Sequence, residues 1–197
     1  MDTCLLLAAF PPELAGLGES PPLGWRLVLT GAGAIAAAAT TARLLAEDKP
    51  SKVLFLGTCG AYSTALDIGY CLAVSEAIAV SIPEIRRRAY RPGIETTRWP
   101  AAWDLPLAKH SLAAPPAITT DPDDAALLGG IADVENLEVA GVFAACAAAG
   151  VPAAAALVVA NRVGPDAHEE WTANHEGASR KLVDTLYSMG VFGATDH

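Results

Sequence analysis

Five positions in the sequence combine a chemically useful residue type with a location where a strand should end or a helix should begin. They are Glu13, the glycine turn at 31–33, the glycine turn at 57–60, Glu138 and Asn161. Carboxylates and an amide could bind a polar ligand and move a proton, and glycines let a backbone approach a flat ligand. In open α/β sheets, ligands bind beyond the carboxyl ends of the strands, where such positions converge. The set therefore predicts one ligand site.

Each of these positions also has a purely structural interpretation. Glu138 opens an Ala-rich run together with Glu135 and Asn136, and all three could simply complement a helix N-terminus. Glu13 could be an exposed carboxylate in a short helix, and Asn161 could form a turn. The two glycine segments could be plain turns. Local pattern alone leaves both interpretations open.

Short apolar runs alternate with longer Ala-rich runs, and this alternation predicts the elements that must position the five sites. Strands are expected at 3–10, 25–31, 52–58, 68–80 (as one long or two short strands), 116–120, 131–135 and 153–161. Helices are expected at 34–47, at 121–130, from Glu138 onward and at 165–189. Residues 82–116 are rich in Pro, Arg and Trp and predict an irregular excursion. The order indicates an α/β fold in a single domain (1–197), with a mixed, largely parallel sheet covered by helices on both faces.

The composition argues against several classes of partner. The 197 residues are 52% hydrophobic and 18% charged, which is typical of a folded domain. The net charge of −9 at pH 7 disfavours binding to nucleic acid or to an anionic membrane. No apolar run reaches transmembrane length, and the first residues lack the basic segment of a signal peptide. We therefore expect a cytoplasmic protein that binds a small ligand.

The cysteines and histidines lack the spacing of metal ligands. The cysteines contain no CxxC pair, so we expect reduced thiols that pack in the core: Cys4, Cys59, Cys71 and Cys146. The histidines fall outside the strand ends and are expected to be solvated: His110, His168, His175 and His197. We expect neither a metal nor another cofactor.

Ordered segments across nearly the whole chain resemble one enzyme family. In chain order they are AAFPPEL (8–14), LTGAG (29–33), FLGTCGAY (55–62), IGYCLAVSEAI (68–78), VENLEVAGVFAACAAAGVP (134–152) and VVANRVGPDAHEEW (158–171). The ordered set resembles the nucleoside phosphorylase and nucleosidase superfamily. The segments VENLE and ANRVG, with Trp171 nearby, are most similar to futalosine hydrolases, which cleave the N-glycosidic bond of a modified inosine in menaquinone biosynthesis. The resemblance implies a three-layer α/β/α fold and commonly a homodimer.

The resemblance also implies roles for the candidate residues. Glu13 matches the carboxylate that activates water in nucleosidases, and Glu138 matches the one that holds the ribose hydroxyls. Asn161 occupies the position of the acid that activates the base. The remaining substrate-binding candidates lie in the same matched segments: Gly33, Thr58, Cys59, Gly60, Asn136 and Leu137.

Two departures from the family pattern bear on the reaction and on the base. Phe55 stands where phosphorylases carry a phosphate-binding arginine, and an apolar ring cannot neutralise a phosphate dianion, so water is the expected nucleophile. Adenine-specific nucleosidases place Ser-Asp where this chain has Ala160 and Asn161. An amide can donate only a hydrogen bond, which suits a 6-oxopurine whose O6 and N7 both accept.

The expected function is therefore hydrolysis of a purine nucleoside, a small-molecule substrate of the futalosine type, to free base and sugar. Breaking the bond to the purine makes the ribosyl ring positive and the base negative, so both ends need stabilisation. Three other functions remain open: a nucleosidase for methylthioadenosine or S-adenosylhomocysteine, a nucleoside phosphorylase, and a non-catalytic nucleoside-binding protein.

Overall fold

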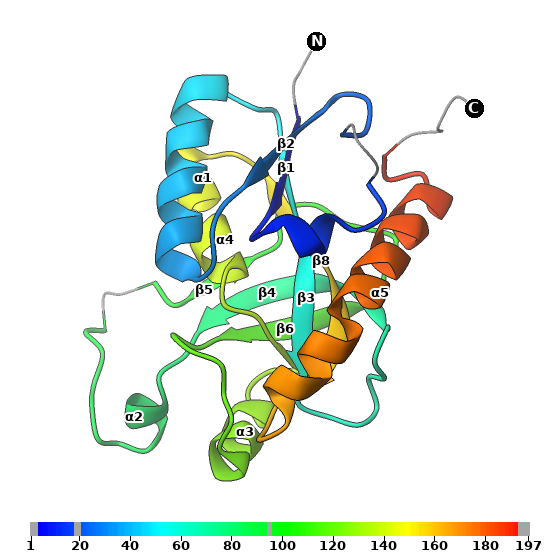
Figure 1. Cartoon of the computed structure of the whole chain (residues 1–197). Coiled ribbons are helices and arrows are strands. Elements are labelled where there is room, and N and C mark those ends of the chain that lie inside the picture. The colour runs from blue at the N-terminus through cyan, green and yellow to red at the C-terminus, as the bar shows by residue number, and fades with distance from the viewer. Residues whose placement is uncertain (1–3, 18–20, 94–95, 193–197) are drawn as a thin grey trace.

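The structure is a computed structural model that describes residues 4–17, 21–93 and 96–192, and it is built around one mixed sheet (Figure 1). The strands are β1 (Cys4–Ala8), β2 (Trp25–Leu29), β3 (Val53–Ala61), β4 (Cys71–Ala79), β5 (Arg98–Pro100), β6 (Lys109–Ala114), β7 (Val134–Glu135) and β8 (Ala153–Arg162). The helices are the 3-10 turn η1 (Pro11–Leu14), α1 (Ala34–Asp48), α2 (Ile82–Ile85), α3 (Pro122–Gly129), α4 (Val139–Ala149) and α5 (Ala167–Ser188).

The sheet is largely parallel, as the sequence predicts. Its strand order is β2-β1-β3-β7-β6-β4-β5, and β8 pairs with both β3 and β4. The pairs β1–β2, β1–β3, β3–β8, β4–β6 and β6–β7 are parallel, whereas β3–β7, β4–β5 and β4–β8 are antiparallel. Every residue of β3 is buried, and so are all but the last of β8. Such continuous apolar runs fit strands that are covered on both faces.

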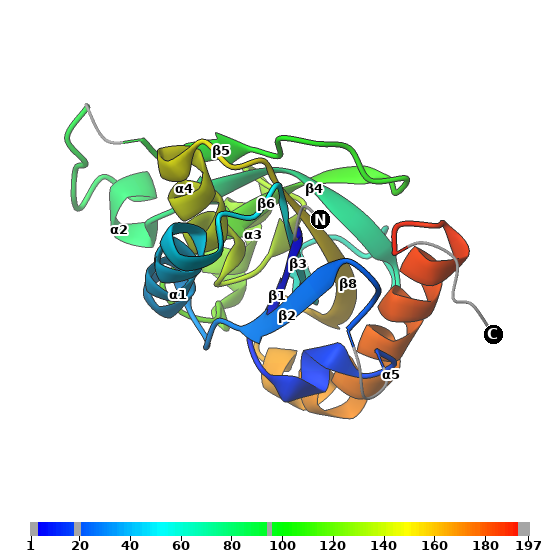
Figure 2. The same ribbon diagram turned by 90° about the horizontal axis from the view of Figure 1, so that it is seen from above.

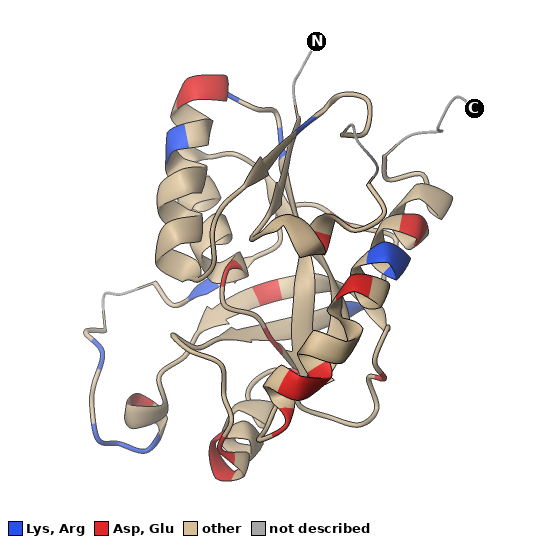
Figure 3. Ribbon diagram, viewed as in Figure 1, with Lys and Arg blue, Asp and Glu red and all other residues tan. Residues whose placement is uncertain are grey.

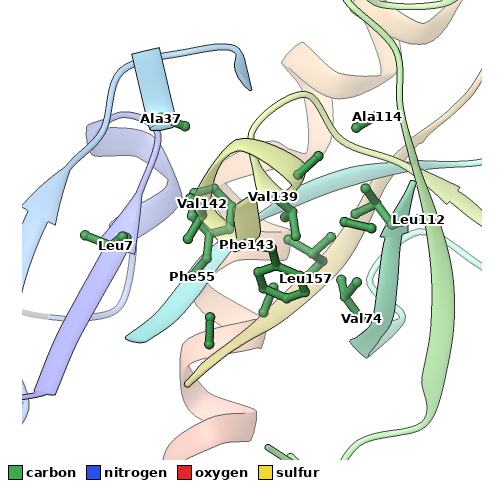
Figure 4. Packing of buried hydrophobic residues seen from close by; sticks show 14 of the residues in the cluster. Leu7, Ala37, Phe55, Val74, Leu112, Ala114, Val139, Val142, Phe143 and Leu157 are labelled. Atoms are coloured by element: carbon green, nitrogen blue, oxygen red, sulfur yellow. The ribbon is translucent and has the colours of Figure 1, made fainter. Parts of the chain in front are cut away.

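Helices cover both faces of the sheet and make three layers. On one face, Leu7 and Phe55 pack with Val142 and Phe143 of α4, beneath α1 (Figure 4). On the other face, Leu6 and the alternate residues of β3 pack against α5. Figure 2 shows α1 and α4 side by side, with α5 on the opposite side of β3 and β8. The alternation of strand side chains between two faces produces this three-layer α/β/α arrangement.

Three sequence-based expectations about the sheet are wrong. The glycine segment 57–60 is not a turn after β3 but part of the strand, because it pairs with β8 on one side and β7 on the other. Residues 116–120 form no strand, since Pro115 and Pro116 have no N–H to donate to a ladder. Strands β5 and β6 both lie within the 82–116 segment, which was expected to be irregular.

Charged residues lie mainly on the helices and outer loops, while the sheet is largely uncharged (Figure 3). Within the described parts of the chain, no helix has both the length and the hydropathy that crossing a membrane would need. All four cysteines are free thiols, and two of them, Cys59 and Cys146, are buried. The notable exceptions to the uncharged interior are three acidic residues, Glu13, Glu135 and Glu138, which are each at least nine-tenths buried.

Candidate active site

A cavity of about 290 Å³ lies where β3 and β8 end and where η1, α4 and α5 begin. Its walls combine acidic, amide and aromatic side chains: Phe10, Glu13, Ala32, Thr58, Cys59, Gly60, Ile118, Glu135, Asn136, Leu137, Glu138, Asn161, Ala167, His168 and Trp171. Neither lysine nor arginine occurs among these described wall residues. A second cavity, of about 430 Å³, is lined by Tyr62 and residues of α3, and none of the predicted site residues lines it.

Glu13 is held at the cavity by the tight turn that follows β1. Pro11 and Pro12 begin η1, a position where proline's missing N–H costs nothing. Glu13 is only 2% exposed. Its Oε2 accepts a hydrogen bond from the Ala9 N–H at 3.0 Å, and its Oε1 accepts from the Thr58 N–H at 2.8 Å and the Thr58 hydroxyl at 3.1 Å. The carboxylate is thus fixed in one orientation.

Burial raises the pKa of Glu13 to about 7, from an ordinary value of 4.5. The hydrogen bonds from Thr58 and Ala9 oppose this rise, because they favour the charged form, while the nearby Glu138 adds to it. A carboxyl group that titrates near neutral pH can take up a proton during a reaction and release it again. Glu13 therefore has the properties of a general base.

Glu138 comes from the other half of the chain and lines the same cavity. Its Oε1 accepts a hydrogen bond from the Gly33 N–H at 2.7 Å, and burial raises its pKa. Gly33 has a φ of +86°, a conformation that favours glycine, and this aims its N–H at the carboxylate. Gly33 itself was expected to contact a ligand, but it is the neighbouring Ala32 that lines the cavity.

Asn136 resolves the two interpretations of the acidic helix start. Its Oδ1 accepts hydrogen bonds from the N–H groups of Glu138 and Val139 at 2.9 and 3.0 Å. Its Nδ2 donates to the carbonyl oxygen of Thr58 at 3.1 Å. The amide therefore satisfies the first N–H groups of α4 and leaves the Glu138 side chain to face the cavity. The same amide links Glu138 to Thr58, which binds Glu13.

Asn161 and Gly60 lie side by side where β8 and β3 end. Asn161 is 8% exposed, and its Nδ2 donates to the carbonyl oxygen of Arg162 at 2.7 Å. A Cβ added to Gly60 would lie 3.0 Å from Asn161 Nδ2 and 2.8 Å from Val163 Cγ2. Only glycine leaves room there for the amide. Cys59 and Leu137, two other predicted site residues, also line the cavity.

Several wall residues were missed by the sequence analysis. His168 was expected to be a solvated histidine, but although exposed it also forms part of the cavity wall, because it lies in the first turn of α5. Glu135 accepts hydrogen bonds from the Tyr62 hydroxyl at 2.8 Å and the Thr119 N–H at 3.0 Å. Trp171 entered the sequence analysis only through the family resemblance. It follows His168 by one helical turn, which places both side chains on the same face of α5.

The cavity can hold a small polar ligand between two buried acids. Within residues 4–17, 21–93 and 96–192, no group of three His, Cys, Asp or Glu side chains is placed to bind a metal ion. In three-layer α/β/α proteins, paired carboxylates and an amide at the carboxyl ends of the strands form the kind of site in which small ligands bind.

The chain belongs to the phosphorylase superfamily, whose family model matches residues 25–128, more than half of the 197 residues. No curated protein sequence matches the chain significantly.

Solved structures share the whole fold. A 5′-methylthioadenosine/S-adenosylhomocysteine nucleosidase from Helicobacter pylori, bound to butyl-thio-DADMe-Immucillin-A, is similar with a TM-score of 0.83 and 17% identity, over 96% of this chain and 97% of that one. The futalosine hydrolase of Helicobacter pylori has a TM-score of 0.82 and 17% identity, over 95% and 97%. A nucleosidase of the first kind from Colwellia psychrerythraea, in complex with adenine, has a TM-score of 0.76 and 16% identity, over 94% and 96%. At these identities the likeness concerns the fold.

Proposed function

We propose that this protein hydrolyses the N-glycosidic bond of a purine nucleoside to give free base and sugar. The observation that carries the proposal is that Glu13 and Glu138, two buried acids from opposite halves of the chain, line one cavity. The hydrogen bonds of Asn136 and Thr58 connect them. Membership of the phosphorylase superfamily supports the same class of substrate.

Glu13 acts on the water in this mechanism. As the bond between the sugar and the purine breaks, positive charge grows on the ribosyl ring, and water must attack its anomeric carbon. Glu13, with a pKa of about 7, orients that water and accepts its proton. General base catalysis of this kind contributes roughly 10²–10⁴-fold to a rate.

Glu138 and Asn161 act on the two ends of the nucleoside. The Glu138 carboxylate accepts hydrogen bonds from the ribose hydroxyls, which fixes the ring and favours its positive charge in the transition state. Asn161 contacts the purine at the other end of the cavity and donates a hydrogen bond as negative charge grows on the base. Stabilising both charges lowers the barrier to bond breaking.

Water is a better nucleophile than phosphate for this cavity. Phe55, which stands where the related phosphorylases carry an arginine, is fully buried in the core. The described wall residues include neither lysine nor arginine. A phosphate dianion would meet the acidic side chains of Glu13, Glu135 and Glu138 there without a compensating cation, which is unfavourable in a desolvated site.

The base is a 6-oxopurine, and the substrate is of the futalosine type. The Asn161 amide has both a donor and an acceptor, and its donor suits O6 and N7 of a 6-oxopurine. The similar structure of a futalosine hydrolase supports this choice, and those of the nucleosidases for methylthioadenosine make an adenine nucleoside the second candidate.

Release of the free base in phosphate-free buffer tests the proposal. We expect an inosine-type nucleoside to be cleaved faster than an adenosine-type one, as measured by chromatography. We expect Glu13→Gln to lower kcat/KM by about 10²–10⁴-fold, because an amide cannot accept the proton from water. Glu47→Gln is the matched control, since Glu47 pairs with Arg43 on the exposed surface of α1. Turnover only with added phosphate would indicate a phosphorylase, and purine binding without cleavage would indicate a binding protein.

We also propose that two copies of the chain form a homodimer. Two apolar side chains close to the cavity are exposed: Ile35, which is 87% exposed near Gly33, and Ile118, which is 55% exposed in the cavity wall. A second copy that covers them would remove apolar surface from water. Sedimentation at micromolar concentration should give about twice the mass of one chain. A monomer at all concentrations would contradict the dimer.

A further inference from the structure

Three side chains form a hydrogen-bonded series from α5 to the buried acid of η1. The indole Nε1–H of Trp171 donates to the Thr58 hydroxyl oxygen at 3.1 Å. The Thr58 hydroxyl donates in turn to Oε1 of Glu13 at 3.1 Å. The residues come from α5, β3 and η1, so the series crosses three elements that are distant in the sequence.

The direction of each hydrogen bond follows from chemistry alone. An indole N–H is a donor and has no acceptor atom, so Thr58 must accept from Trp171. A hydroxyl has one proton, and the lone pair facing Trp171 is occupied, so the proton is directed away from the indole. Glu13 Oε1 is the acceptor on that side. The indole therefore determines which way the Thr58 hydroxyl points.

The position of Trp171 is itself closely defined. The carboxylate of the preceding residue, Glu170, accepts a hydrogen bond from the Arg162 N–H at 2.6 Å, which ties the start of α5 to the end of β8. The indole stacks on the ring of His175, with centroids 4.1 Å apart and planes 13° apart. The Phe10 ring contacts it at a centroid distance of 5.7 Å. Two ring contacts and the fixed start of α5 therefore hold the indole against Thr58.

We propose that Trp171 is a positioning residue, which orients the Thr58 hydroxyl toward Glu13 and so keeps the base in its charged form. The inference rests on the proposed function, in which charged Glu13 accepts the proton of water. Trp171 acts through Thr58, and its effect on catalysis is an effect on the proton affinity of Glu13. Without the indole, the hydroxyl is free to rotate away, and its stabilising hydrogen bond to the carboxylate is weakened.

Other titratable groups also face Glu13, so a test of Trp171 must leave these residues unchanged. Glu135 lines the same cavity from the end of β7, Glu138 from the start of α4, and His168 from α5. Cys59 is the neighbouring thiol on β3. A Trp171→Phe change leaves all of them in place and retains an aromatic ring against Phe10 and His175.

The pH dependence of kcat/KM tests the proposal. The wild type should gain activity as the pH rises through about 7, the pKa of Glu13. In Trp171→Phe this acid limb should move up by about 0.4–1 pH unit, because the net value of one hydrogen bond corresponds to a shift of that size. Thr58→Val should give a similar shift. The double variant, Trp171→Phe with Thr58→Val, should shift the acid limb no further than Thr58→Val alone. Thr58→Ser, which keeps the hydroxyl, should restore the wild-type limb.

A matched control separates this effect from the general loss of an indole. Trp103 also donates its Nε1–H, to the carbonyl oxygen of Val53, and lies outside the cavity. Trp103→Phe should leave the acid limb in place. An unchanged limb in Trp171→Phe, with only KM altered, would overturn the proposal, and so would additive shifts in the double variant.

Direct titration distinguishes a failure of this inference from a failure of the proposed function. The carboxyl carbon of Glu13, observed by ¹³C NMR and assigned by its loss in Glu13→Gln, reports protonation without any turnover. Trp171→Phe should raise the titration midpoint by the same 0.4–1 pH unit. If the midpoint rises but no nucleoside is cleaved, only the proposed function fails. If the midpoint stays where it is, Trp171 has no influence on Glu13.

Discussion

At the scale of single residues, Asn161 has a neighbour that determines what a substitution would do. Its Nδ2 donates to the Arg162 carbonyl oxygen at 2.7 Å. A carboxylate in the same place would face that oxygen without a proton between them, so Asn161→Asp should hold its proton more tightly than an ordinary aspartate. The substitution would thus place a proton donor, in place of an amide, at the base end of the cavity.

We expect Asn161→Asp to change the choice of base. A carboxylic acid can give a proton to N7 of adenine, whereas an amide can only donate a hydrogen bond. The ratio of kcat/KM for an adenosine-type over an inosine-type nucleoside should rise at least about tenfold, the equivalent of 1.4 kcal/mol. Asn174→Asp on α5, outside the cavity wall, is the control. An unchanged ratio would remove Asn161 from base recognition.

At the scale of elements, the close approach of α1 and α4 depends on one glycine. A Cβ added to Gly141 in α4 would lie 2.1 Å from the carbonyl oxygen of Ala34, the first residue of α1. Backbone atoms cannot rotate aside as side chains do, so the two helices would have to separate. Ala34 follows Gly33, whose N–H binds Glu138, and the separation would therefore disturb the site as well.

Two glycine-to-alanine changes test this packing. Gly141→Ala should lower the free energy of unfolding by about 1–3 kcal/mol, the usual cost of overpacking, and should reduce activity. Gly177→Ala, within α5, should raise it by about 0.5–1 kcal/mol, because a Cβ there meets nothing within 4 Å and alanine favours a helix. Urea denaturation measures both. If both changes altered the free energy of unfolding equally, the α1–α4 contact would accommodate a Cβ more easily than its geometry indicates.

Elements with a strong periodic pattern could be predicted from the sequence, and elements defined by their partners could not. The Ala-rich helices and the apolar runs of β1, β3 and β8 were predicted close to their observed bounds. The glycine segment 57–60 looked like a turn because its two glycines lack strand propensity, yet pairing with β7 and β8 keeps it extended. Strand β6 was missed because its residues, KHSLAA, are a strand only beside β4 and β7.

The same distinction holds for the site. Glu13, Glu138 and Asn161 follow strands or precede helices, so the rule about strand ends found them. Glu135 and Trp171 are different, because their hydrogen bonds cross between segments that the local pattern cannot relate. Asn136 lies between these cases: its place at a helix start was predictable, but its bond to Thr58 was not.

At the scale of the whole molecule, Glu13 links the function to the pH dependence of stability. Its pKa is about 7 in the folded protein and should return to its ordinary value of 4.5 on unfolding. Between these pH values the folded protein binds more protons, so the contribution of Glu13 to stability is complete below about 4.5 and is lost as the pH rises through 7. A change of this size corresponds to about 3 kcal/mol.

We expect Glu13→Gln to remove this part of the pH dependence. The amide cannot titrate, although its NH₂ group would face the Ala9 N–H and lower stability equally at every pH. From pH 5 to pH 8 the unfolding free energy of the wild type should therefore fall relative to that of the variant. Urea denaturation at both pH values measures it. A difference that does not vary with pH would mean that Glu13 titrates normally in the folded protein.

The hydrogen bond between the Gly33 N–H and Glu138 joins residues that are 105 positions apart. Because it orients the acid assigned to the sugar, no fragment of the chain that stops before α4 can assemble a working site. During refolding from denaturant, catalytic turnover should consequently return only with the latest long-range docking event and lag behind the recovery of helical signal. The time at which enzyme activity returns would then report when the native topology is complete.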